Sequence, residues 1–188
     1  MEIRVVDYVA NRIFELGVEY VFTLTGGGAM FLNDGIAKHP ELKVVCSHHE
    51  QASAMAAVGY GKYSGKMGVV MPTTGCGSTN TITGLLEAWQ DNLPTFFISG
   101  QVNKGQATGN IDLPLRQLGV QEANIIEIVK SITKYSVMIN DPEMIAYHID
   151  RAIHEAFSGR PGPVWLDIPM DVQGALVETD NLQRYIPE

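Results

Sequence analysis

The chain has 188 residues, of which 45% are hydrophobic and 18% charged, a composition that suits one globular domain with its own core and excludes a disordered segment. Its formal net charge of −8 argues against nucleic acid or an anionic membrane as the main partner. The first residues lack the pattern of a signal peptide, and no apolar run approaches the roughly 18 residues that cross a bilayer, so we expect a cytoplasmic protein.

Helical and strand patterns alternate along the chain. They predict helices at 5–16, 29–38, 50–63, 77–90 and 141–157. Between and around these helices they predict strands at 20–24, 42–47, 67–71, 94–99, 132–139 and 163–168. This alternation predicts an α/β fold of three layers, α/β/α, around a mostly parallel six-stranded sheet. Ligands of such folds bind in the loops at the carboxyl ends of the strands.

Two intervals lack such patterns. Residues 100–124 are rich in glycine and polar side chains, and a loop of this length inside a compact domain is usually functional. Residues 174–188 have the composition of a linker or tail, so we expect a domain over 1–173 and then a continuation toward a central domain. Cys46 and Cys76 lack metal-ligand spacing and are expected to be two free, buried thiols, with a disulfide as the alternative.

Glu50 follows an expected strand and opens a helix of small residues. From position alone it is an ordinary first-turn glutamate that favours the positive end of the helix dipole. Small residues behind it, however, let other elements pack closely, and a carboxyl in buried surroundings can share a proton with a heterocyclic nitrogen. His48 and His49 precede it, and adjacent side chains on a strand point in opposite directions. Without a third ligand cluster we expect no metal here, and we place His49 on the substrate side instead.

Two glycine-containing segments also follow expected strands. The segment 25–28 permits close backbone approach to a ligand, or makes a flexible turn. The segment 72–80 joins a strand to a helix through Gly75 and Gly77, and backbone amides at a helix start bind anions or polar ring atoms. It nearly matches the dinucleotide fingerprint, but Asn80 stands where the third glycine belongs, and a tight turn with a Ser/Thr cap is the structural alternative.

Six motifs occur together in one order: VFTLTGG, HHEQASAMAAVGYGKYSGK, GVVMPTTGCGSTN, DNLPTFFISGQV, VQEANII and SGRPGPVWLDIPMDVQ. Their order and spacing resemble the N-terminal, pyrimidine-binding domain of thiamine diphosphate-dependent enzymes such as acetolactate synthase, pyruvate oxidase and glyoxylate carboligase. The resemblance covers about residues 1–173. It implies an acetolactate synthase-like carboligase or decarboxylase, a transferase or lyase that acts on 2-oxo acids as a homodimer.

The resemblance also implies roles for single residues. Glu50 matches the glutamate that shares a proton with N1′ of the cofactor's aminopyrimidine, which prepares the thiazolium C2 for attack on a 2-oxo acid. The cofactor-binding residues that it implies are Thr25, Gly26, Thr74, Gly75 and Asn80, and Gln121 falls on the substrate side.

The chain departs from the family pattern in four places, one of which is a stretch between Gln101 and Gln121 that is several residues longer than usual. The usual Tyr-Pro-Gly-Gly is Leu24-Thr25-Gly26-Gly27 here, the usual Ser-Gly-Pro-Gly is Thr74-Gly75-Cys76-Gly77, and Val120 replaces a phenylalanine. The family's G-D-G and N-N pattern, which binds diphosphate and Mg²⁺ in a separate domain, does not occur. We therefore expect Mg²⁺ only in a missing diphosphate-binding domain, on the same or a partner chain, and no activity from this chain alone.

Several interpretations stay open on these residues. The linker-like end favours an excised domain of a longer enzyme over one subunit of a split enzyme. A non-catalytic regulatory or subunit-binding module of the same fold is the first alternative, because of the departures from the pattern. An unrelated nucleotide-binding α/β domain is the second, because of the GCGSTN motif. The small residues of the Glu50 helix further predict self-association through that face.

Overall fold

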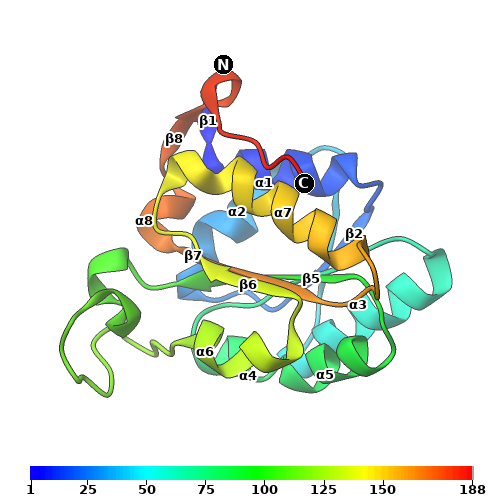
Figure 1. Cartoon of the computed structure of the whole chain (residues 1–188), viewed down its shortest axis with the longest axis horizontal. Helices are drawn as coiled ribbons and strands as arrows, with labels where there is room; N and C mark the ends of the chain where they lie inside the picture. The colour runs from blue at the N-terminus through cyan, green and yellow to red at the C-terminus, as the bar shows by residue number, and fades with distance from the viewer. Residues whose placement is uncertain (188) are drawn as a thin grey trace.

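The computed structural model describes residues 1–187 and has the predicted α/β architecture (Figure 1). Six strands form one sheet in the order β3-β2-β4-β5-β7-β6, and every neighbouring pair is parallel. The strands are β2 (Tyr20–Thr23), β3 (Lys43–Cys46), β4 (Gly68–Met71), β5 (Thr95–Gln101), β6 (Tyr135–Met138) and β7 (Val164–Pro169). The predicted six-stranded, mostly parallel sheet is therefore confirmed.

Helices cover both faces of the sheet (Figure 1). One face carries α1 (Val5–Glu15), α2 (Met30–Lys38) and α7 (Ile145–Phe157), and the other carries α3 (Glu50–Ser64), α5 (Ile82–Gln90) and α6 (Ile125–Val129). The short helices are α4 (Cys76–Thr79), α8 (Met170–Gln173), η1 (Gly27–Ala29), η2 (Lys104–Gln106), η3 (Thr108–Asn110), η4 (Lys130–Ile132), η5 (Pro142–Met144) and η6 (Thr179–Asn181). No helix within residues 1–187 is long and apolar enough to cross a membrane.

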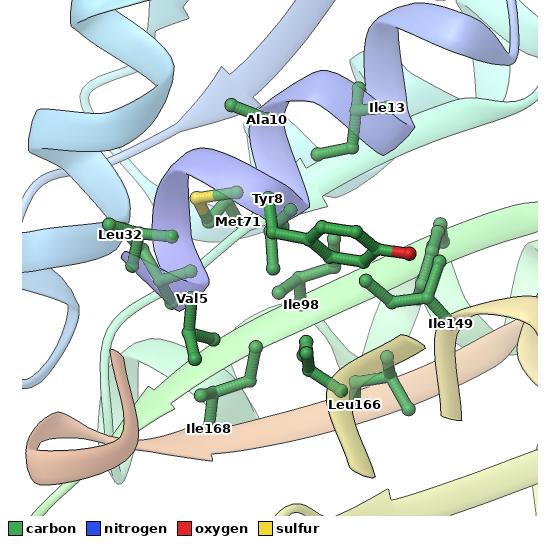
Figure 2. Packing of buried hydrophobic residues seen from close by; sticks show 14 of the residues in the cluster. Val5, Tyr8, Ala10, Ile13, Leu32, Met71, Ile98, Ile149, Leu166 and Ile168 are labelled. Atoms are coloured by element: carbon green, nitrogen blue, oxygen red, sulfur yellow. The ribbon is translucent and has the colours of Figure 1, made fainter. Parts of the chain in front are cut away.

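The core forms two layers because strands buried on both faces alternate their side chains between them. On the larger side, Val5 and Ile13 of α1 pack over the sheet above Ile98 and Leu166, as Figure 2 shows. This is the helix face that the spacing of its apolar residues predicts. On the other side, the rings of Phe97 and Trp165 stack with centroids 5.0 Å apart. The central strands β5 and β7 therefore contribute side chains to the core on both faces of the sheet.

Two local differences from the predicted elements have physical causes. The helix expected at 77–90 is two helices, α4 and α5, separated at Asn80. There the Asn80 amide bonds a distant carboxylate, and the Thr81 hydroxyl donates to the carbonyl of Ser78 at 2.7 Å; such side-chain bonds compete with continuous helix. The helix α6, which was not expected, begins where the Asn124 side chain accepts from the backbone N–H of Glu127.

The C-terminal segment packs on the domain. A short strand β8 (Leu176–Glu178) pairs antiparallel with the N-terminal strand β1 (Glu2–Arg4). Val177 is 1% exposed and joins the core, and Arg184 bonds the Asp150 carboxylate on α7. Residues 175–187 thus differ from the free linker that their composition suggests, and the domain boundary at 173 stays a prediction.

Candidate functional site

The segments expected to carry chemistry meet at the carboxyl edge of the sheet. Thr23, at the end of β2, pairs with Cys46 of β3 and with Met71 of β4, so the loops after these three strands start side by side. The next strand joins them, because the amide of Gly100 donates to the carbonyl of Pro72 at 3.1 Å. Between β2 and β4 the strand order reverses, and in open α/β sheets such a switch point is where ligands bind.

Glu50 is the first residue of α3 and is only 8% exposed. Its Oε2 accepts a hydrogen bond from the side-chain amide of Asn80 at 2.9 Å, which ties α3 to the loop after β4. A Cβ placed on Gly77 would lie 3.2 Å from Oε1, the other carboxylate oxygen. Within residues 1–187 no hydrogen bond reaches Oε1. One carboxylate oxygen is therefore held by the protein, and the other has its bonding capacity unused.

Glycines let three segments approach one another around this carboxylate. A Cβ on Gly26 would lie 2.5 Å from the Thr73 side chain, and one on Gly77 would lie 2.6 Å from the same side chain. Gly75 has φ +60°, and a Cβ there would lie 1.8 Å from the carbonyl oxygen of Gln121. A Cβ at such a distance would force its neighbour to shift, and at Gly75 the neighbour is backbone and φ is positive, so that position requires glycine. The loop containing Gln121, which itself has φ +59°, is thus brought against the loop after β4.

Two hydroxyls near Glu50 lack partners within the described chain. The Oγ atoms of Ser53 and Thr73 are buried and make no hydrogen bond there. Ser53 lies three residues after Glu50 on α3, hence on the same helix face, and Thr73 lies against Gly26 and Gly77. Buried polar groups are nearly always paired. The glycine cradle, the carboxylate and these unpaired hydroxyls therefore bring hydrogen-bonding groups together at one point of the sheet edge.

Other predicted site residues lie at the rim. Thr25, His49 and Gln121 are exposed, whereas Thr74 is buried. The Nδ1 atom of His49 accepts from the backbone N–H of Gln51 at 3.2 Å, so this side chain caps α3. Within residues 1–187 no group of three His, Cys, Asp or Glu side chains could hold a metal ion.

The cysteines require a correction. Cys46 and Cys76 are free, as expected, but both are exposed instead of buried. Cys46 ends β3, an edge strand whose four residues are all exposed, and Cys76 begins the four-residue helix α4 at the surface of the site. An edge strand and a loop leave side chains uncovered that a central strand would bury.

A buried polar network beneath the site was missed by sequence reasoning. The Asp167 carboxylate of β7 accepts from the Ser99 hydroxyl at 2.6 Å and from the Gln101 amide at 3.0 Å. Ser99 also accepts from the Trp165 indole N–H at 2.8 Å, and the Thr74 hydroxyl donates to Gln101 at 2.5 Å. The sequence feature that could have predicted this network is Asp167, a charged residue inside the otherwise apolar VWLDI strand.

Burial raises the pKa of Asp167 to about 7, against the opposing effect of its hydrogen bonds from Ser99 and Gln101. Between its ordinary value of 3.8 and this raised pKa, the folded chain holds a proton that the unfolded chain has released. The contribution of Asp167 to stability is therefore fully present below its ordinary pKa and is lost as pH rises through 7.

We accordingly predict a pH-dependent stability that replacement of Asp167 by Asn removes. Between pH 4 and pH 8, the contribution of this carboxyl to the free energy of unfolding should fall by about 2–4 kcal/mol. Urea unfolding of both proteins at several pH values measures it as the difference between wild type and D167N. A difference that does not change with pH would contradict the assignment of this titration to Asp167.

Comparisons with known proteins show the family to which the chain belongs. Residues 3–129 match the family described as "Thiamine pyrophosphate enzyme, N-terminal TPP binding domain". The chain is 37% identical over 173 residues to the chloroplastic acetolactate synthase of Arabidopsis thaliana, covering 90% of this chain and 24% of that protein. It is 37% identical over 164 residues to the acetolactate synthase large subunit of Lactococcus lactis, covering 87% of this chain and 27% of that protein. It thus spans about a quarter of the length of these relatives. The chain belongs to the family of N-terminal domains of thiamine pyrophosphate enzymes, and its similarity within that family is to acetolactate synthases.

Proposed function

We propose that the chain is the cofactor-activating domain of a carboligase or decarboxylase for 2-oxo acids, and that Glu50 shares a proton with the aminopyrimidine of thiamine diphosphate. The observation that carries the proposal is the state of the Glu50 carboxyl: it is buried, fixed through one oxygen by Asn80, and free to bond through the other. A carboxyl in this setting can hold or move one proton at a fixed point.

The other residues around Glu50 have supporting roles in this proposal. Gly26, Gly75 and Gly77 let the loops of the site pack closely against one another around the carboxylate. The hydroxyls of Ser53 and Thr73 are unpaired within residues 1–187 and enclosed by protein, so a shift of the neighbouring side chains is needed before they can bond a ligand. When bound, thiamine diphosphate supplies the nucleophilic carbon that attacks a 2-oxo acid. Thr25, Thr74, His49 and Gln121 complete the proposed set, the first two on the cofactor side and the last two on the substrate side.

The diphosphate and Mg²⁺ have no binding residues in this proposal. We assign them to a diphosphate-binding domain on the same or a partner chain, and we expect the 188 residues alone to be inactive. The test is thiamine diphosphate-dependent consumption of pyruvate by the full-length protein. Activity that needs both the cofactor and Mg²⁺ supports the proposal. A full-length protein without this activity favours a regulatory or subunit-binding module, and saturable binding of NAD or FAD favours a nucleotide-binding domain.

We further propose that the domain meets its partner chain through the α3 side. Met55 of α3 is 43% exposed, and Val44 and Val45 of the edge strand β3 are also exposed. His49, Gln51, Ala52 and Met55 line a shallow hollow there. In this proposal these exposed apolar side chains are covered by the partner chain. Light scattering at high concentration that shows a monomer would count against a homodimer.

The bond between Asn80 and Glu50 leads to a further prediction. Replacement of Asn80 by Leu keeps the volume but removes the donor to Glu50 Oε2, and a hydrogen bond to a charged group contributes about 1.5–3 kcal/mol. We expect kcat/KM of the full-length protein to fall roughly tenfold to a hundredfold. In a background that already carries Glu50→Gln the same change should have a much smaller effect, because the two residues act as one unit. Equal effects in both backgrounds would show that Asn80 acts independently of Glu50.

A further inference from the structure

The side-chain amide of Gln101, at the end of β5, makes four hydrogen bonds while only 2% exposed. Its oxygen accepts from the Thr74 hydroxyl at 2.5 Å and from the backbone N–H of Val102 at 3.0 Å. Its nitrogen donates to the carbonyl of Ala123 at 2.9 Å and to Asp167 at 3.0 Å. All bonding positions of the amide are in use, and two of its partners belong to different loops of the candidate site.

Three groups determine which way this amide faces. The backbone N–H of Val102 only donates, whereas the carbonyl of Ala123 and an ionised Asp167 only accept, so the nitrogen of Gln101 must face Asp167 and its oxygen is left to accept from Thr74. The reversed amide would set two oxygens against each other. The second oxygen of Asp167 takes the Ser99 hydroxyl at 2.6 Å. Because a buried carboxylate costs desolvation energy, its contribution here lies in geometry more than in stability.

We propose that Asp167 is a positioning residue of the site, which fixes the amide of Gln101 and thereby holds the loop of Thr74 against the loop that begins at Gly119 and ends at Ala123. The close contact of Gly75 with the Gln121 carbonyl lies at the junction of these two loops. This inference rests on the proposed function in one respect: the two loops are assumed to surround the cofactor.

Protonation of Asp167 should not loosen this arrangement. A protonated carboxyl still accepts through its second oxygen, and its O–H can donate to the second lone pair of the Ser99 oxygen, which accepts from the Trp165 indole at 2.8 Å. On the loop side, the charged group that acts on Asp167 is Glu122, which is buried and bonds the Thr108 backbone at 3.1 Å and hydroxyl at 2.7 Å. Its negative charge favours the protonated form of Asp167. Because the ordered loops raise the pKa of Asp167, their order should increase as pH falls through 7.

Hydrogen exchange of backbone amides in the full-length protein, followed by mass spectrometry, tests the proposal. In Asp167→Asn only one acceptor oxygen remains for two donors, so the segment 119–124 should exchange about tenfold faster at pH 8. The matched control is Asp150→Asn, because Asp150 is a carboxylate on α7 that bonds Arg12 and Arg184. This control should leave the exchange of 119–124 unchanged.

The pH dependence separates positioning from a merely structural role. After correction for intrinsic rates, wild-type exchange in 119–124 should slow down as pH falls through 7, because the ordered loops hold the proton of Asp167, whereas D167N should show no such change. Gln101→Met keeps the volume of the side chain but removes its amide, and it should accelerate exchange as much as D167N does. The double variant should show no further increase, because both changes break one linkage.

Two results would overturn the proposal. One is wild-type protection of 119–124 in D167N. The other is a uniform acceleration over all strands in both D167N and Q101M, which would indicate general loss of stability. The exchange assay contains no cofactor, so a failure of the role assigned to Glu50 would leave its result intact. Conversely, normal protection in D167N would leave the role of Glu50 untouched.

Discussion

Replacement of Glu50 by Gln should lower kcat/KM of the full-length protein by roughly 10²–10⁴-fold, the usual loss when one general acid/base group is removed. Glutamine keeps the size of the side chain, and its oxygen can still accept from Asn80, which now bonds Oε2 at 2.9 Å. It cannot hold or release a proton at the second position. The predicted defect is therefore chemical, and binding of thiamine diphosphate should change far less than the rate of the cofactor-dependent reaction.

The measurement is steady-state pyruvate consumption, with cofactor binding followed separately by calorimetry. Glu87→Gln is the matched control, because Glu87 lies on α5 and pairs with Lys62 at the surface at 3.0 Å. Its activity should stay within a factor of two of wild type (about 0.4 kcal/mol). If E50Q turned over at near the wild-type rate, Glu50 would be a structural first-turn residue after all.

Replacement of Gly75 by Ala should destabilise the protein by about 3–5 kcal/mol. Two costs combine at this position. The backbone has φ +60° and ψ −119°, which L side chains rarely adopt. The new Cβ would also lie 1.8 Å from the Gln121 carbonyl oxygen, so the two loops must separate. Urea unfolding measures the loss, and cofactor binding should weaken in the same variant because the cradle opens.

Gly65→Ala isolates the conformational cost from the steric one. Gly65 ends α3 with φ +69°, but a Cβ there would meet nothing within 4 Å. Only the left-handed conformation is penalised, at about 1 kcal/mol. Equal losses in G65A and G75A would mean that the contact between Gly75 and Gln121 contributes nothing to stability.

The local chemistry of the sequence predicts much of this fold. The apolar spacing of α1, the proline after Asp141 and the left-handed Gly65 each have a cause within a few residues, and the structure contains the expected element at each place. Glu50 is also buried, as the small residues of α3 led us to expect. These features depend on helix periodicity and capping, which act over one or two turns.

Other features depend on which distant residues become neighbours. Ser99 and Asp167 are direct register partners in the pairing of β5 with β7, and a slip by one residue would place Asp167 on the opposite face. Likewise, β8 is only three residues long and has no strand-like signal of its own, yet it pairs with β1 across most of the chain. Register and long-range pairing follow from tertiary packing, so neither could be derived from local patterns.

The network around Asp167 also contains a tryptophan whose intrinsic fluorescence can report on it. The chain has two tryptophans: Trp89 is 40% exposed, whereas Trp165 is fully buried and its indole N–H donates to the hydroxyl that bonds Asp167. The emission of Trp165 should therefore respond to the charge state of that carboxyl without any added dye. In a Trp89→Phe background, the intensity of the remaining fluorescence plotted against pH would trace the protonation of a single buried group.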